Sequence, residues 1–286
     1  MQTVHTLASL RAAVDHWRSE RQRVAFVPTM GNLHDGHLQL VSRAARAGER
    51  VVVSIFVNPT QFAPDEDFAH YPRTLKQDSL KLAENGVHLL FAPGLEEMYP
   101  HGPENTARVE VPGLSEQLEG AARPGFFTGV ATVVTKLLCA VRPHVAVFGE
   151  KDYQQLLLVR RLVAELCMPV EIIAAPTVRE LDGLAMSSRN SYLSMEQRRR
   201  APVLYASLCR VRDRLLQGER NYAAMENDAR HQLLAAGFRP DYVALRRAAD
   251  LAAPAAADEQ LVVLAAARLG TTRLIDNLLV TLKNKS

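Results

Sequence analysis

Short apolar runs alternate with amphipathic segments along the first part of the chain. The apolar runs end at turn-forming residues and have the length of buried strands, at 24–27, 51–57, 87–91, 145–148 and 170–174. Between them, apolar residues recur at helical spacing, at 7–21, from near Gly36, at 75–84, at 128–141 and at 153–166. This alternation predicts an α/β fold, in which a doubly wound parallel sheet is covered by helices on both faces.

The pattern changes after Pro176. Helical spacing continues over 195–217 and 222–236, and strand-like segments follow at 242–245, 261–266 and 272–279. The chain of 286 residues is also long enough for two domains. We therefore predict a first domain over residues 1–176 and a smaller α+β domain over residues 177–286.

Charge and composition exclude several classes of function. There are 34 Lys and Arg against 31 Asp and Glu, a net charge of +3 that is too small for a general grip on nucleic acid. The arginines at 198–200 are interpreted as a solvated helix face. No apolar run approaches the roughly 20 residues that span a bilayer, and the N-terminal segment lacks an apolar signal core. We expect no nucleic-acid partner and no membrane association.

The three cysteines, Cys139, Cys167 and Cys209, are widely spaced and include no C-x-x-C pair. Neither a disulfide framework nor a zinc cluster is indicated, so a reducing, cytoplasmic location is expected.

Polar, aperiodic segments follow three of the predicted strands, at 28–37, 58–71 and 149–155. Ligands of open parallel sheets bind beyond the carboxyl ends of the strands. A fourth polar segment, 177–190, opens the second domain. If these four segments converge, they form a cleft between the domains, which is a usual place for an active site with two substrates.

The first polar segment contains two histidines, His34 and His37, at a predicted helix start. Their ring N–H groups, beside the free amides of the helix, could hold a triphosphate and stabilise charge developing at phosphorus. Gly36 leaves room for an adenine or ribose against the backbone. A fortuitous pair and a metal site are the alternatives, although no third ligand stands at a recognisable spacing.

The segment Met186-Ser187-Ser188-Arg189 provides two hydroxyls and a guanidinium. Arginine binds phosphate oxygens in a bidentate manner, so this segment suits a lid over a nucleotide. Taken alone, a serine-rich surface turn is the simpler reading.

These residues resemble a known family. His34-x-Gly36-His37 resembles the His-Ile-Gly-His signature of the nucleotidylyltransferase and class I aminoacyl-tRNA synthetase superfamily, and residues 186–189 resemble its Lys-Met-Ser-Lys-Ser lid. The chain is most similar to the pantoate–β-alanine ligase family, through PTMGNLHDGH (28–37), SIFVNPTQF (54–62), YPRT (71–74), FGEKDYQQ (148–155), PTVRELDGLAMSSRN (176–190) and ARLGTTRLIDN (267–277). Either short signature alone would be weak, but six stretches in order are specific.

The resemblance implies a Rossmann-like first domain that binds ATP and pantoate, and a C-terminal lid domain. It implies that pantoate attacks ATP to give pantoyl adenylate and pyrophosphate, and that β-alanine then releases AMP and pantothenate. A nucleotidylyltransferase that stops after adenylyl or cytidylyl transfer is one alternative, and it predicts a basic pocket for a substrate phosphate. An RNA-binding or non-catalytic relative is the other, and the near-neutral charge argues against it.

The resemblance also assigns residues. Catalysis falls to His37 as proton donor, with His34, Lys151 and Arg189. ATP binding is expected at Met30, Gly31, Asn32, Leu33, His34, Asp35, Gly36, His37, Gly149, Glu150, Lys151, Asp152, Val178, Met186, Ser187, Ser188 and Arg189. Pantoate is expected at Gln61, Gln155, Met30 and Asn58, and β-alanine at Gln61. A neutral amide such as that of Gln61 both donates and accepts, so it can bind pantoate without neutralising the attacking carboxylate.

Three further expectations follow from the resemblance. Mg²⁺ is expected to arrive on the ATP phosphates, with no protein ligand except Asp78 as a possible outer-shell carboxylate. A homodimer is expected, with the strand that contains SIFV (54–57) as a candidate edge. Phe126 stands where the family commonly has His, which places any polar role of that loop in doubt.

Overall fold

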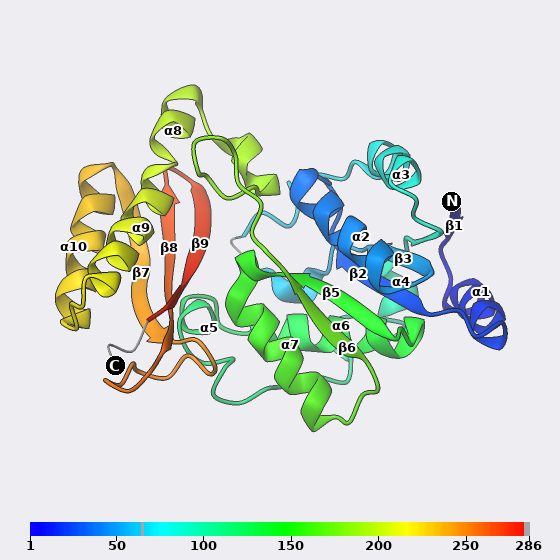
Figure 1. Cartoon of the computed structure of the whole chain (residues 1–286). Helices are drawn as coiled ribbons and strands as arrows, with labels where there is room; N and C mark the ends of the chain where they lie inside the picture. Colours follow the sequence, from blue (N-terminus) through cyan, green and yellow to red (C-terminus); the bar gives the residue numbers. More distant parts are fainter. Residues whose placement is uncertain (64–65, 283–286) are drawn as a thin grey trace. The chain divides into compact units, whose positions relative to one another are not determined.

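The computed structural model describes residues 1–63 and 66–282. The chain forms two compact units (Figure 1). Unit 1 comprises Met1–Glu150 and Leu158–Pro176, and unit 2 comprises Lys151–Leu157 and the chain from Thr177 onward. Residues 151–157, which the sequence pattern places in the first domain, thus belong with the second unit.

Unit 1 is built on a parallel sheet of six strands in the order β1-β4-β3-β2-β5-β6. The strands are β1 (Gln2–Val4), β2 (Val24–Thr29), β3 (Arg50–Ile55), β4 (Leu89–Phe91), β5 (Val145–Gly149) and β6 (Glu171–Ala175). Five of them confirm the apolar runs of the sequence. The three residues of β1, which pair with Leu89–Phe91 of β4, are too few to produce a periodic signal.

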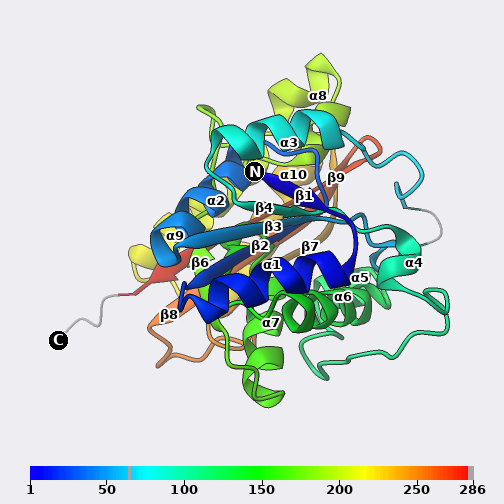
Figure 2. The same ribbon diagram turned by 90° about the vertical axis from the view of Figure 1, so that its right-hand side faces the viewer.

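Helices cover both faces of this sheet, as the alternation predicts. Figure 2 shows α2 (Asp35–Ala47) and α3 (Leu75–Glu84) on one face, and α1 (Leu7–Ser19) and α6 (Phe126–Val141) on the other. Alternate residues of the strands face α2 and α3, where Ala25, Val27, Val51 and Val53 pack with Val41, Ala44 and Leu82. The remaining helices of this unit are the short α4 (Leu95–Met98) and α5 (Glu119–Ala122), and the latter part of α7 (Tyr153–Glu165).

The strand that contains SIFV is not an edge strand. β3 is paired with β2 on one side and β4 on the other, and the two edges of the sheet are β1 and β6. The expectation that this strand forms a dimer edge is therefore wrong. Apolar character marks burial, and an interior strand is as apolar as an interface strand.

Unit 2 contains an antiparallel sheet of β7 (Phe238–Arg247), β8 (Gln260–Leu269) and β9 (Thr272–Thr281). Its helices are α8 (Met195–Arg200), α9 (Val203–Leu216) and α10 (Tyr222–Ala235). Residues from α9, α10 and the three strands form one buried core, which includes Leu208, Met225, Leu233, Phe238 and Val263. This confirms the α+β class of the second part.

The single helix predicted over 195–217 is wrong, because α8 ends at Arg200 and α9 begins at Val203. Pro202 lies between them, and proline has no N–H to donate to the preceding turn. β7 also begins at Phe238, four residues before the predicted start, and a register shift lies between Pro240 and Tyr242.

Candidate active site

The segment between β2 and α2 presents the two histidines. His34 caps α2, and its Nδ1 accepts a hydrogen bond from the Gly36 N–H at 3.1 Å. The Nδ1 of His37 accepts from the His34 N–H at 3.4 Å, and the ring centroids lie 4.1 Å apart. Because Nδ1 is an acceptor in both rings, the proton of each neutral ring is on Nε2. The pair therefore carries two Nε2–H donors at a helix N-terminus, which suits an anion.

Helix α3 holds the backbone just before these histidines. The carboxylate of Asp78, which is 1% exposed, accepts from the Asn32 N–H at 2.9 Å and the Leu33 N–H at 2.8 Å. Lys81 Nζ donates to the Leu33 carbonyl at 2.6 Å. Gly31 has φ +85°, a left-handed conformation that favours glycine, and a Cβ there would make a tight contact with Asp78 Oδ2 at 3.1 Å.

These contacts change the interpretation of Asp78. Its Oδ2 also accepts from the Thr74 hydroxyl at 3.0 Å, so both oxygens bind protein groups. Asp78 therefore stabilises the loop that carries His34.

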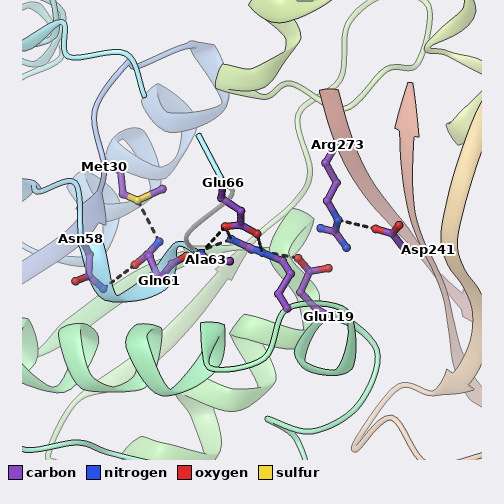
Figure 3. Close-up of polar contacts among 9 residues, drawn as sticks. Met30, Asn58, Gln61, Ala63, Glu66, Glu119, Asp241 and Arg273 are labelled. Carbon is purple, nitrogen blue, oxygen red and sulfur yellow. Dashed lines mark hydrogen bonds and ion pairs between the residues drawn. The ribbon is translucent and has the colours of Figure 1, made fainter. Parts of the chain in front are cut away.

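The second polar segment begins with a 3-10 turn, η1 (Pro59–Gln61), and brings three predicted pantoate residues together (Figure 3). Asn58 Nδ2 donates to Gln61 Oε1 at 3.1 Å, and Gln61 Nε2 donates to Met30 Sδ at 3.0 Å. Asn58 is 1% exposed and caps η1 by accepting from the Thr60 N–H. Both ends of the Gln61 carboxamide are thus oriented by neighbours.

The sequence did not indicate the residues that support this turn. Tyr99 Oη donates to Asn58 Oδ1 at 2.7 Å. Burial raises the pKa of the Tyr99 hydroxyl above its usual value, although its hydrogen bond with Thr60 lowers it, so the hydroxyl remains a donor at neutral pH. At Gly129 of α6, a Cβ would lie 2.1 Å from the Thr60 carbonyl oxygen. Only glycine lets α6 pack this closely on η1.

The segment after β5 is divided between the two units. Gly149 ends β5 and Glu150 begins the 3-10 turn η2 (Glu150–Asp152), whereas Lys151 and Asp152 belong to unit 2. Gln155 lies in the first turn of α7, within unit 2. The carbonyl of Lys151 accepts from Asn277 Nδ2 at 2.8 Å, so β9 fixes the backbone at this lysine.

The predicted lid segment begins with a small hairpin. Met186 N donates to the Val178 carbonyl at 2.9 Å, and Arg179 and Ala185 form an antiparallel bridge. Ser187 Oγ accepts from the Arg189 N–H at 3.3 Å and caps the 3-10 turn η3 (Ser188–Tyr192). Val178 and the 186–189 segment are therefore brought together.

A buried ion pair that the sequence analysis missed holds this hairpin. Arg179 donates to Asp276 Oδ2 at 2.7 Å and Oδ1 at 2.9 Å, and also to the carbonyls of Gly183 and Asn277. Burial raises the pKa of Asp276, and Arg179 acts in the opposite direction. Arg179 and Asp276 both lie inside stretches that resemble the family, and this was the one signal in the sequence that could have pointed to the pair.

The sequence is similar to known proteins over nearly its whole length. The family model for pantoate-beta-alanine ligase matches residues 2–279. The chain is 58% identical over 282 residues to a pantothenate synthetase of Thioalkalivibrio sulfidiphilus and 55% identical over 284 residues to that of Nitrosococcus oceani, covering 99% of both chains in each case. The chain belongs to the pantoate–β-alanine ligase family.

Solved structures agree with this membership. A pantothenate synthetase from Thermus thermophilus superposes with a TM-score of 0.91 at 51% identity, covering 97% of this chain and 99% of that one. A pantoate-beta-alanine ligase from Francisella tularensis, described as complexed with beta-gamma ATP and beta-alanine, has a TM-score of 0.81 at 34% identity, covering 98% and 97%.

Membership of this ligase family defines the reaction. The enzyme condenses pantoate with β-alanine through pantoyl adenylate, at the expense of ATP, and releases AMP and pyrophosphate. A nucleotidylyltransferase that stops after the first transfer is a different family, and so is an RNA-binding relative.

The ligase departs from the family's usual His at Phe126, and the structure gives this residue a contact. The Arg123 guanidinium carbon lies 3.7 Å from the centroid of the Phe126 ring, a cation–π contact. The loop therefore keeps a charged group even though residue 126 is apolar.

Proposed function

We propose that the ligase uses the His34–His37 pair as the centre of its adenylation step. The observation that supports this most is the placement of the two rings, 4.1 Å apart, at the N-terminus of α2 on a loop held by Asp78. In this step a pantoate carboxylate oxygen bonds to the α-phosphorus of ATP, the bond to the β-phosphate oxygen breaks, and pyrophosphate leaves with that electron pair. Such a displacement needs positioning and charge stabilisation more than a protein nucleophile.

The proposed catalytic groups divide into the two histidines and two cations. We assign His37 as the donor to the departing phosphate and His34 to phosphate binding beside it. Lys151 and Arg189 would stabilise the charge on the transferred and leaving phosphates, with Ser187 as a further donor. Lysine at a helix start opposes the helix dipole, which favours an anionic ligand for Lys151.

Nucleotide binding is proposed for the backbone and side chains around these groups. The set comprises Met30, Gly31, Asn32, Leu33, His34, Asp35, Gly36, His37, Gly149, Glu150, Lys151, Asp152, Val178, Met186, Ser187, Ser188 and Arg189. We propose residues 177–286 as a lid domain that carries the 186–189 segment, and residues 1–176 as the part that binds ATP and pantoate.

Pantoate binding is proposed for Gln61, Gln155, Met30 and Asn58, and β-alanine binding for Gln61. The contacts among Met30, Asn58 and Gln61 support this assignment, because they orient a neutral carboxamide before substrate binds. In the second step the β-alanine amine attacks the acyl carbon of pantoyl adenylate, the acyl–phosphate bond breaks to release AMP, and the nitrogen loses a proton.

Mg²⁺ is proposed to enter with ATP. Within residues 1–63 and 66–282, no three or more His, Cys, Asp or Glu side chains are grouped so as to hold a metal ion. We propose that phosphate oxygens and water supply its ligands, as is usual for this ion. Chelation by excess EDTA should abolish pyrophosphate release, and added Mg²⁺ should restore it.

We also propose a homodimer in the cytoplasm. Cys139, Cys167 and Cys209 are free thiols, which suits a reducing compartment. None of the helices in the described part of the chain is long and apolar enough to cross a membrane. The resemblance to the family supports the dimer. Size-exclusion chromatography with light scattering would measure the mass of the particle in solution directly.

A pyrophosphate-release assay tests these roles. Pyrophosphate should appear only when ATP and pantoate are both present, and AMP and pantothenate should form when β-alanine is added. His37→Ala should lower adenylate formation by at least about 100-fold, a typical effect of removing a positioned proton donor. His231→Ala, at an exposed position of α10, is the matched control. Near-normal activity of His37→Ala would remove this residue from the mechanism.

Gln155→Ala separates the pantoate site from the nucleotide site. We expect its KM for pantoate to rise while its KM for ATP stays close to that of the wild type. An effect confined to ATP would contradict the pantoate assignment.

A further inference from the structure

A largely buried cluster of three charged side chains lies beside Gln61 (Figure 3). Arg123 Nε and Nη2 donate to the two oxygens of Glu66, each at 2.6 Å, and Nη1 donates to Glu119 Oε1 at 3.3 Å. The side chains of Arg123, Glu66 and Glu119 are 12%, 13% and 8% exposed. We call Arg123, Glu66 and Glu119 the Arg123 cluster.

The Arg123 cluster is attached to the backbone of Gln61. Arg123 Nη2 also donates to the Gln61 carbonyl oxygen at 3.1 Å. Glu66 Oε2 accepts from the Ala63 N–H at 3.3 Å, so the cluster contacts the chain on both sides of Phe62. The Phe126 ring, 3.7 Å from the guanidinium carbon, contacts one face of the arginine. The guanidinium is therefore held at its edges by acceptors and at one face by an aromatic ring.

Gln61 is thus fixed independently at its backbone and at its side chain. The side chain contacts Asn58 and Met30, and the backbone carbonyl contacts Arg123. The contact from Arg123 therefore adds to the packing of α6 on η1 and acts on the backbone of Gln61 itself. Fixing one residue's backbone costs about 1–2 kcal/mol of conformational entropy, so a preformed turn spares the substrate that cost.

We propose that Arg123 and Glu66 are positioning residues for pantoate, which act by holding Gln61 in its substrate-binding orientation. This inference rests on the proposed role of Gln61. Neither Arg123 nor Glu66 is assigned contact with substrate. The planar fork of arginine is essential to the arrangement, because it binds Glu66 with two parallel bonds while still reaching Glu119 and the Gln61 carbonyl. Lysine keeps the charge but cannot make this set of bonds.

The test is Arg123→Lys, with a matched control elsewhere in the chain. Arg214 binds two carboxylates in the same manner, donating through Nε and Nη2 to Glu219 at 2.7 and 2.6 Å and through Nη1 to Asp228 at 2.7 Å. Arg214 has no role in the proposed site. Arg214→Lys therefore reports the effect of dismantling a comparable ion pair without touching Gln61.

We expect Arg123→Lys to raise the KM for pantoate by about 10- to 100-fold, the range that displacement of a substrate-positioning group produces. Its KM for ATP should stay within about twofold of the wild type. Glu66→Gln should act in the same direction but more weakly, because the amide oxygen still accepts one bond from Arg123. Arg214→Lys should leave both KM values unchanged.

A double-mutant comparison separates positioning from general destabilisation. In a Gln61→Ala background, Arg123→Lys should add little further increase in the KM for pantoate, because the carboxamide that it positions is gone. Additive effects, or equal increases in the KM for ATP and for pantoate, would overturn the inference. If Arg123→Lys does not fold, Glu66→Gln in the two backgrounds decides the question by the same criterion.

The same variants keep the two hypotheses distinct. If Gln61→Ala leaves the KM for pantoate unchanged, the proposed function of Gln61 fails. If Gln61→Ala raises that KM but neither Arg123→Lys nor Glu66→Gln does, only the positioning role of the Arg123 cluster fails.

Discussion

Asp276→Asn should strongly destabilise the ligase. Asp276 and Arg179 form a bidentate pair at 2.7 and 2.9 Å, with side chains that are 2% and 17% exposed. Asparagine has nearly the same shape but no charge, and its NH₂ group would face the guanidinium at one of the two oxygen positions. The substitution therefore leaves Arg179 buried without a counter-charge.

The magnitude follows from the cost of burying an unpaired charge. Breaking a buried pair by removing one partner costs about 3–5 kcal/mol of unfolding free energy, a large part of the roughly 5–15 kcal/mol typical of a folded protein. Burial raises the pKa of Asp276 and outweighs the opposing effect of Arg179. In a buried pair desolvation offsets much of the attraction, whereas removal of one partner leaves an uncompensated charge, so the disruption is the costly change.

The assay is urea-induced unfolding at about pH 7.5, followed by circular dichroism. Asp250→Asn is the matched control, because Asp250 forms a bidentate pair with Arg247 at 2.8 and 2.6 Å but with side chains 49% and 40% exposed. Exposed pairs contribute about 0–1 kcal/mol, so the control should remain near the wild-type stability. A loss below about 1 kcal/mol for Asp276→Asn, or equal losses for both variants, would refute the reasoning.

Three further predictions concern other parts of the structure. Asp78→Asn should lower the rate of adenylate formation by about 10- to 100-fold, since an amide cannot accept from both loop N–H groups and the histidine loop shifts; an unchanged rate in pyrophosphate release would contradict this. Gly129→Ala should lower the melting temperature more than Gly94→Ala does. The added Cβ at position 129 would lie 2.1 Å from a carbonyl oxygen, whereas a Cβ at position 94 would have nothing within 4 Å. Burial, and then nearby arginines, lower the pKa of His88 and of His144, each of which accepts a backbone N–H through Nδ1. The unfolded chain therefore binds protons at these two histidines more readily than the folded chain does. The stabilising contribution should be complete above about pH 6.5 and should decline as the pH falls below it. Urea midpoints at several pH values measure this decline, and replacing both histidines by glutamine should weaken it.

The pattern of apolar residues determined the architecture of both units. Five of the six strands of the parallel sheet, and the longer helices between them, follow from periodicity alone, because alternating buried runs and amphipathic helices pack in few ways; the short α4 and α5 were not predicted. The short motifs identified the candidate site, because residues at a strand end and a helix start have their surroundings defined by local backbone geometry. The His34–His37 contacts are of this kind, spanning only two or three residues.

Only the tertiary structure decided which distant side chains support those motifs. Asp78 meets the loop 46 residues before it, and Arg179 meets Asp276 across 97 residues. Periodicity reports that a position is buried or exposed, but it does not report which partner lies opposite. For the same reason the sequence could not place SIFV in the interior of the sheet, since strand order depends on how the crossover helices pack and not on the composition of any one strand.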